Sequence, residues 1–144
     1  MSVAYIDPTR AQFDAFKALD RDRPIAMLNL VRYRPEAAYP EDHARAGDGL
    51  TGAQAYRLYS DESAAIFRRV GGEVIWAGAP LLVLTGPADE SWHTAFVARY
   101  PSAHAFLEMV TDPDYRRAVI HRQAAVLTSR LIRCEPRAAG GGFG

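Results

Sequence analysis

An α+β fold, with helices on one face of an antiparallel sheet, is predicted by the order of the periodic segments in this sequence. Strand patterns occur in 24–33, 73–85, 92–100 and 127–134. Apolar stripes at helical spacing lie between the first two of these strands and between the last two. Strand, helix, strand, strand, helix, strand is the order of a ferredoxin-like domain. The 144 residues, 49% of them hydrophobic, suit one such domain and leave no room for a second.

A short extra helix is predicted at the amino terminus. Asp7 can supply a carboxylate cap, and Pro8 follows in the first turn, where its missing N–H costs nothing. Apolar residues then recur at helical spacing: Phe13, Phe16 and Leu19. We therefore expect a helix that ends near Asp20.

The first strand of the sheet, 24–33, has apolar side chains on both faces. Ile25, Met27, Asn29 and Val31 alternate with Ala26, Leu28, Leu30 and Arg32. Helices cover only one face of such a sheet, so the other face needs a further cover. A second copy of the same sheet is the simplest one, and the sequence therefore predicts a homodimer.

A surface loop and the first main helix are expected next. The stretch 34–49 holds prolines, glycines and charges without a period, which is typical of a surface loop and makes it the expected site of mobility. Thr51 and Gln54 form a capping box, and one helical stripe follows. Its members are Tyr56, Tyr59, Ser63, Ile66, Phe67 and Val70. Gly71 and Gly72 end the helix.

The second strand is expected in two pieces, 73–77 and 81–85, because Gly78-Ala79-Pro80 interrupts the pattern. The third strand runs over 92–100, where alternate side chains point to opposite faces, until Pro101 ends it.

A helical stripe around Phe106 and a second piece that restarts at Asp112-Pro113 lead to the last strand, 127–134. We expect one domain over 1–137 and a disordered glycine-rich tail over 138–144.

Composition excludes several classes of partner and location. Seventeen basic residues balance 17 acidic ones, so neither nucleic acid nor an anionic membrane is an expected partner. Cys134 is the only cysteine, which fits a reducing cytoplasm, and neither a signal peptide nor a membrane-spanning stretch is present. The third strand lacks the aromatic pattern of RNA-recognition domains.

The familiar catalytic motifs are missing from the sequence. It has no G-x-S-x-G elbow, phosphate loop, dinucleotide fingerprint, H-E-x-x-H or C-x-x-C. The four histidines are not spaced as metal ligands, so no metal and no cofactor is predicted, although a metal site built from remote residues stays open.

Polar residues on apolar faces are the remaining candidates for chemistry, because a buried polar group needs a partner or a ligand. Asn29 either donates to a ligand oxygen or makes a structural hydrogen bond to a loop. Tyr59 either points its phenol into a pocket or packs in the core. His121 is either a general base or a surface imidazole. These three are the catalytic candidates.

Five further residues are candidate ligand contacts. Tyr56 opens the helical stripe, and Trp76 and Trp92 offer flat apolar walls that would otherwise seal a core or a dimer seam. His104 flanks an apolar stripe. Arg122 either holds an anionic ligand or pairs with a carboxylate such as Asp112 or Glu108.

Three segments together also resemble a known family: MLNLVRYR, AYRLYSDESAAIFRRVGGEVIWAG and YPSAHAFLEMVTDPDYRRAVIHRQAAVLTSRLI. Over about 25–132 they are similar to the domain of unknown function 1330, within the dimeric α/β-barrel superfamily. The resemblance implies the fold and a dimer, and it brings no agreed activity. The leading helix and the 34–49 loop are elaborations on it.

Three functional hypotheses follow. By analogy with other members of that superfamily, the chain is a cofactor-independent monooxygenase, isomerase or lyase acting on an aromatic or polyketide-like acid. Alternatively it binds or degrades haem, although Met109 stands where similar barrels have a tryptophan. The third hypothesis is a non-catalytic dimer that binds a small molecule or a partner.

Overall fold

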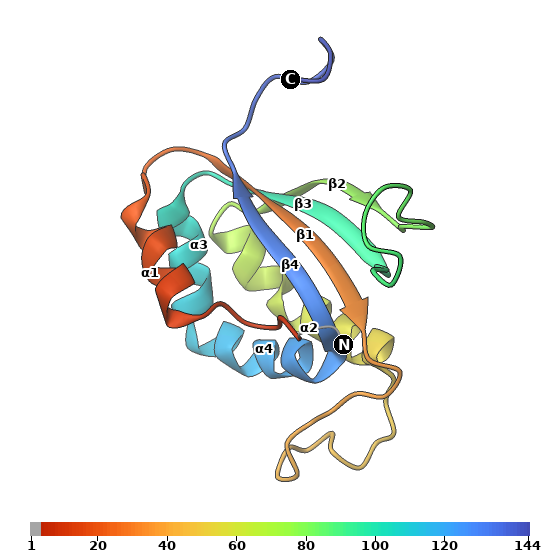
Figure 1. The fold of residues 1–144 in the computed structure, drawn as a ribbon. Coiled ribbons are helices and arrows are strands. Elements are labelled where there is room, and N and C mark those ends of the chain that lie inside the picture. Colours follow the sequence, from red (N-terminus) through yellow and green to blue (C-terminus); the bar gives the residue numbers. More distant parts are fainter. Residues whose placement is uncertain (1–3) are drawn as a thin grey trace.

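The computed structural model describes residues 4–144 and confirms the ferredoxin-like arrangement with an added amino-terminal helix. Its elements are α1 (Arg10–Ala18), β1 (Ile25–Tyr33), α2 (Gly52–Arg69), β2 (Glu73–Gly78), β3 (Thr94–Tyr100), α3 (Ala103–Thr111), α4 (Pro113–Ala125) and β4 (Val126–Cys134). The four strands pair antiparallel in the order β2-β3-β1-β4. Helices α2, α3 and α4 lie on one side of the sheet, and α1 lies beside α3 (Figure 1).

Helix α1 begins later than the sequence pattern predicted. Thr9, not Asp7, is the capping residue: its hydroxyl accepts from the backbone N–H of Gln12 at 3.1 Å, and the Gln12 side chain accepts from the backbone N–H of Thr9 at 3.2 Å. This reciprocal box satisfies two N–H groups that would otherwise have no partner. The Asp7 carboxylate lies farther upstream and does not cap the helix. The helix ends at Ala18, two residues before the expected Asp20.

Helix α2 begins and ends as predicted. Thr51 and Gln54 form the same kind of capping box, and Gly71 follows the helix with a φ of 89°, a value that favours glycine. The expected stripe lies against the sheet: Ser63, Ile66 and Val70 are buried, while Tyr59 and Phe67 pack partly buried against the core.

The two faces of the sheet are both apolar, as predicted. Ile25, Met27 and Val31 face the helices and are buried. The cross-strand register places Leu28 beside Val97 and Ile132 on the opposite face, which we call the open face. Ile132 is 47% exposed there. Among residues 4–144, none of the helices covers the open face (Figure 1).

The predicted second piece of the second strand, 81–85, is wrong. Strand β2 lies at the edge of the sheet and pairs only with β3, and this pairing ends with Gly78 opposite Ala95. Beyond that point only Thr94 of β3 remains, which is too short a partner for a strand over 81–85. Leu81, Leu82 and Leu84 are instead 96%, 78% and 89% exposed.

Strand β3 begins at Thr94, two residues after the predicted start at Trp92. The 34–49 stretch contains no helix or strand, as expected, and it is anchored where the backbone N–H of Ala38 donates to the carbonyl of Ala124 at 2.8 Å. Residues 138–144 are exposed and lie outside any helix or strand. Within residues 4–144, none of the helices is long and apolar enough to span a membrane.

Candidate functional site

A set of polar side chains interrupts the apolar layer between the sheet and the helices. Asn29 lies on the helix-facing side of β1 between Met27 and Val31, which belong to two separate hydrophobic clusters. Phe96, opposite Asn29 in the register, packs against both clusters. The Asn29 side-chain amide donates to the carbonyl of Met27 at 3.0 Å, and its Oδ1 accepts no hydrogen bond from residues 4–144. The expected structural hydrogen bond therefore runs within the strand and not to a loop.

Three tyrosines stand at the same boundary between the clusters. Tyr59 and Tyr115 share a hydrogen bond of 2.7 Å between their hydroxyl oxygens. The Tyr56 ring lies 5.3 Å from the Tyr59 ring, centroid to centroid, and 5.3 Å from the Tyr33 ring. A row of phenols thus runs from the end of β1 to the interior. We name Asn29, Tyr56, Tyr59, Tyr115 and Arg122 the tyrosine seam.

Burial keeps these phenols neutral. It raises the pKa of Tyr56, Tyr59 and Tyr115 above the ordinary value, because a phenolate loses its hydration in the interior. The positive charge of Arg122 opposes this rise for all three. Each hydroxyl is therefore a hydrogen-bond donor at neutral pH, and Arg122 is the nearby group that would stabilise an anion among them.

Arg122 is mostly buried, with its side chain 11% exposed, and it fastens the amino-terminal segment. Its guanidinium donates to the carbonyl of Ile6 at 2.6 Å and to the hydroxyl of Ser129 at 3.2 Å, and it lies 3.7 Å from the carboxylate of Asp7. Arg122 therefore pairs with a carboxylate, as one of its two interpretations expected, but the partner is Asp7 and not Asp112 or Glu108. Asp112 caps the far end of α4, where it pairs with Arg69 at 2.7 Å.

The amino-terminal segment itself is part of the site's wall, which the sequence did not reveal. The backbone carbonyl of Tyr5 accepts from the N–H of Ser129 at 2.7 Å, so this segment runs along the start of β4. Figure 1 shows it crossing close to the junction of α4 and β4. The composition of the amino-terminal segment does not predict this pairing, because the partner residues lie more than 120 positions away in the sequence.

His121 lies apart from the contacts of the seam. Its imidazole is buried, at 5% exposure, between the phenol of Tyr39 at 2.6 Å and the carboxylate of Glu62 at 2.8 Å. The ring of His43 approaches it edge-on at 5.5 Å. On α4, Tyr115 and Arg122 are about two turns apart and share a face, whereas His121 is rotated about 100° from Arg122. The surface interpretation of His121 is therefore wrong, and both of its nitrogens already have partners.

Two of the predicted ligand contacts lie outside this region. Trp76 is 56% exposed on the edge strand β2. His104 is at the surface, 3.1 Å from the carboxylate of Asp22.

A surface hollow of about 610 Å³ opens beside the seam. It is lined by Tyr33, Ala53, Gln54, Tyr56, Arg57, Ser60 and Asp61. Tyr56 lines this hollow, and its ring lies 5.3 Å from the Tyr59 ring, centroid to centroid.

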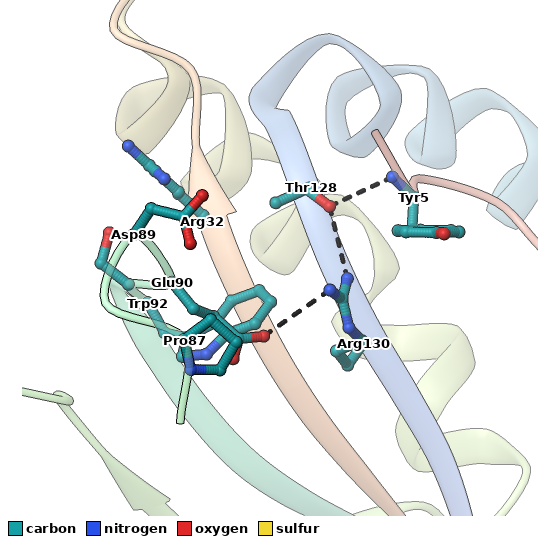
Figure 2. A pocket seen from close by; sticks show the side chains of 9 residues that line it. Tyr5, Arg32, Pro87, Asp89, Glu90, Trp92, Thr128 and Arg130 are labelled. Carbon is teal, nitrogen blue, oxygen red and sulfur yellow. Dashed lines mark hydrogen bonds and ion pairs between the residues drawn. The ribbon is translucent and has the colours of Figure 1, made fainter. Parts of the chain in front are cut away.

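A second cavity, of about 220 Å³, lies on the open face (Figure 2). Trp92, the remaining predicted ligand contact, lines it together with Tyr5, Arg32 and Arg130. The Arg130 guanidinium lies over the rings of Tyr5 and Trp92, at 4.9 and 5.2 Å from their centroids. Trp92 is only 9% exposed, so it serves as a wall and not as a free surface group. Across residues 4–144, no group of three or more His, Cys, Asp or Glu side chains is arranged to hold a metal ion.

Comparison with known proteins connects this architecture to other chains. The family described as Domain of unknown function (DUF1330) matches residues 49–133. A protein of unknown function from Rhodopseudomonas palustris has 52% sequence identity and a TM-score of 0.87, with 95% of this chain and 100% of that chain covered. No curated protein matches the sequence.

More distant structures share the fold. A NIPSNAP-like domain protein from Burkholderia xenovorans has a TM-score of 0.52 at 16% identity, with 85% of this chain and 93% of that chain covered. SnoaB, a cofactor-independent oxygenase from Streptomyces nogalater, has a TM-score of 0.50 at 14% identity, with 81% and 96% covered.

Proposed function

We propose that this chain, which belongs to the DUF1330 family, binds a small aromatic or polyketide-like acid between its sheet and helices α2 and α4. The observation that carries the proposal is the tyrosine seam. Three neutral phenols and one guanidinium gather in an apolar layer, next to an open hollow that could admit a ligand.

The seam matches such a ligand in both shape and chemistry. Aromatic side chains line the path from Tyr33 to Tyr115, so a flat ring can replace ring contacts that already exist. The phenol hydroxyls can donate to carbonyl or carboxylate oxygens of the ligand, and the free Oδ1 of Asn29 can accept from a ligand hydroxyl. The Arg122 charge favours the anionic form of a bound acid.

The reaction type that we propose is cofactor-independent, of the monooxygenase, isomerase or lyase kind. Such chemistry requires an anion of the substrate, and neutral donors together with one buried cation stabilise an enolate where water is excluded. SnoaB is itself a cofactor-independent oxygenase, in keeping with this proposal, but at 14% identity it contributes the fold alone. Haem binding has no comparable support, since iron ligation by His121 would require the loss of the Tyr39 or the Glu62 contact.

Calorimetric titration and turnover assays with a panel of aromatic acids and quinones test this proposal. We expect Tyr59→Phe to weaken binding, because it removes one donor, by about tenfold if the lost hydrogen bond is worth about 1.4 kcal/mol. Tyr100→Phe is the matched control: Tyr100 is also buried, but among residues 4–144 its hydroxyl has only one hydrogen bond, a long one of 3.9 Å to the Met109 sulfur.

Asn29→Ala separates catalysis from binding. Loss of turnover with retained affinity supports an enzyme, whereas binding without turnover of any panel member supports the non-catalytic alternative. Absence of binding across the whole panel by a folded protein would contradict the proposal.

We further propose that the protein is a homodimer joined through the open face. Exposed apolar side chains on one surface of a monomer call for a partner, and the same face on a second copy supplies the matching chemistry. The residues concerned are Trp76 and Ile132, which the strand register places on the open face and which are 56% and 47% exposed. Light scattering should give twice the 15.9 kDa chain mass, and Ile132→Asp should shift it to the single chain. A wild-type protein with the mass of a single chain would overturn the proposed homodimer.

A further inference from the structure

We infer that residues 79–86, which we call the arm, pack against the second copy of the chain and clasp it. The arm leaves the sheet at the end of β2, and three of its leucines stand in solvent: Leu81, Leu82 and Leu84 are 96%, 78% and 89% exposed. The inference rests on the homodimer proposed above. It adds to that interface a segment outside the sheet.

The arm has the sequence of a strand that the chain's own sheet leaves unpaired. Residues 81–85 read LLVLT, without a charged residue or a proline. Strand β2 ends at Gly78, at the edge of the sheet, so no neighbouring strand reaches the arm. Exposed apolar segments of this kind promote aggregation, and natural proteins cover them. The cover for the arm therefore comes from outside the chain.

The arm lies at the margin of the open face. The residues that follow it run over that face, where the carboxylate of Glu90 lies 3.6 Å from the guanidinium of Arg130 on β4 (Figure 2). The same guanidinium lies over the ring of Trp92, 5.2 Å from its centroid. The backbone N–H of Glu90 donates to the carbonyl of Pro87 at 3.2 Å, which closes a turn at the base of the arm. A second copy on the open face thus meets the arm at its edge.

The shape of the arm directs its leucines outward. The arm folds back at Gly86, which has a φ of 152°, and a Cβ added there would lie 2.8 Å from Cγ1 of Val83. Val83 is accordingly less exposed than the leucines on either side of it. Pro80 and Pro87 restrict the backbone at the two ends. A segment held in this way loses little conformational freedom on binding, so its contacts contribute to affinity.

Charge excludes several other occupants of the arm. No charged residue occurs between Trp76 and Asp89, so the arm has nothing to attract a charged partner. The charged residues nearest to it in the sequence are acidic: Glu73 before it, and Asp89 and Glu90 after it. Segments that insert into anionic lipid surfaces carry basic residues instead.

A second copy supplies the surface that the arm needs. The open face is apolar, with Leu28, Val97 and Ile132 side by side in the register. A two-fold pairing brings the arm of each copy to the same surface of the other, so both arms are covered at once. The exposed leucines and the uncovered sheet face are then explained by one symmetric contact.

Dissociation constants of the dimer, from light scattering over a dilution series, test the clasp. We expect Leu82→Asp combined with Leu84→Asp to raise the dissociation constant at least about a hundredfold, because two carboxylates per chain would enter an apolar contact. Leu82→Met combined with Leu84→Met keeps the arm apolar and should stay within severalfold of the wild type. Leu19→Asp is the matched control, since Leu19 is 56% exposed at the end of α1, away from the open face. It should leave the dissociation constant unchanged, and circular dichroism checks that each variant is folded.

Contact between the arm and the other copy can be observed directly. In dimers mixed from isotope-labelled and unlabelled chains, nuclear Overhauser effects filtered for the label arise only between the two copies. We expect such effects at the methyl groups of Leu81, Leu82 and Leu84.

The outcomes separate the clasp from the dimer. A wild-type protein with the mass of one chain would overturn both. A dimer without these effects, or one that the double aspartate variant weakens no more than Leu19→Asp does, would overturn the clasp and leave the homodimer in place. Co-sedimentation of the wild type with phosphatidylcholine–phosphatidylglycerol vesicles, lost in the double aspartate variant, would assign the arm to a lipid surface and overturn the inference as well.

Discussion

The hydrogen bond between Tyr59 and Tyr115 should appear as a coupling energy in the stability of the protein. The two hydroxyls lie 2.7 Å apart, Tyr115 is 7% exposed, and Tyr59 is packed against the same cluster. Changing either residue alone to phenylalanine leaves the other hydroxyl buried without its partner, which costs about 1–3 kcal/mol. Changing both removes the two polar groups together, and this replacement is expected to be nearly neutral.

A double-mutant cycle measures this coupling. We expect Tyr59→Phe and Tyr115→Phe each to lower the free energy of unfolding by about 1.5 kcal/mol, and the double variant to lose less than either single one. Urea unfolding followed by far-ultraviolet circular dichroism gives these values when the m-values agree. Tyr100→Phe, the buried control with only a sulfur contact at 3.9 Å, should cost less than about 1 kcal/mol. Additive losses in the double variant would show that the two phenols do not form this hydrogen bond.

Further predictions concern pH, the 34–49 loop and one glycine. Burial raises the pKa of Tyr56, Tyr59 and Tyr115, so the unfolded chain loses these phenol protons at a lower pH than the folded chain does. The free energy of unfolding should therefore fall above about pH 10, by up to about 1.4 kcal/mol per pH unit for each phenol. Tyrosinate absorbance should rise together with unfolding, and titration of these phenols before unfolding would contradict their burial. His121→Ala should speed hydrogen exchange in 34–49 by removing the partner of Tyr39, and unchanged exchange would argue against that anchor. Gly52→Ala should cost about 3 kcal/mol in urea unfolding, since its new Cβ would lie 2.2 Å from the Arg34 carbonyl, whereas Gly47→Ala, with open space around it, should cost almost nothing.

Local periodicity predicted most of the fold. The alternation in 24–33 placed Met27 and Asn29 on the same face of the strand, and the Thr51–Gln54 box placed the start of α2. Both signals depend on residues only a few positions apart. The 81–85 segment was misread because its pattern is that of a strand, whereas strand formation depends on a partner that the sheet does not offer there.

The candidate site was predictable only in part, because local sequence patterns do not show which distant residues come into contact. Composition on apolar faces singled out Asn29, Tyr59 and Arg122, because a buried polar group is costly wherever it lies. Their partners come from distant segments: Ile6 is 116 positions from Arg122, and Tyr39 is 82 positions from His121. No periodic signal connects residues so far apart, so neither the role of the amino-terminal segment nor the Tyr39–His121–Glu62 contacts could be read from the sequence.

The most direct test of the proposed function is a nuclear magnetic resonance titration of protein labelled in its tyrosine rings, with an aromatic acid as ligand and single Tyr→Phe variants for assignment. We predict that the resonances of Tyr56, Tyr59 and Tyr115 shift together and saturate at one ligand concentration. Tyr5, which lines the cavity on the other face of the sheet, should not shift with them. Shifts confined to Tyr5, or no saturable shift in the seam across the panel of acids, would contradict the account.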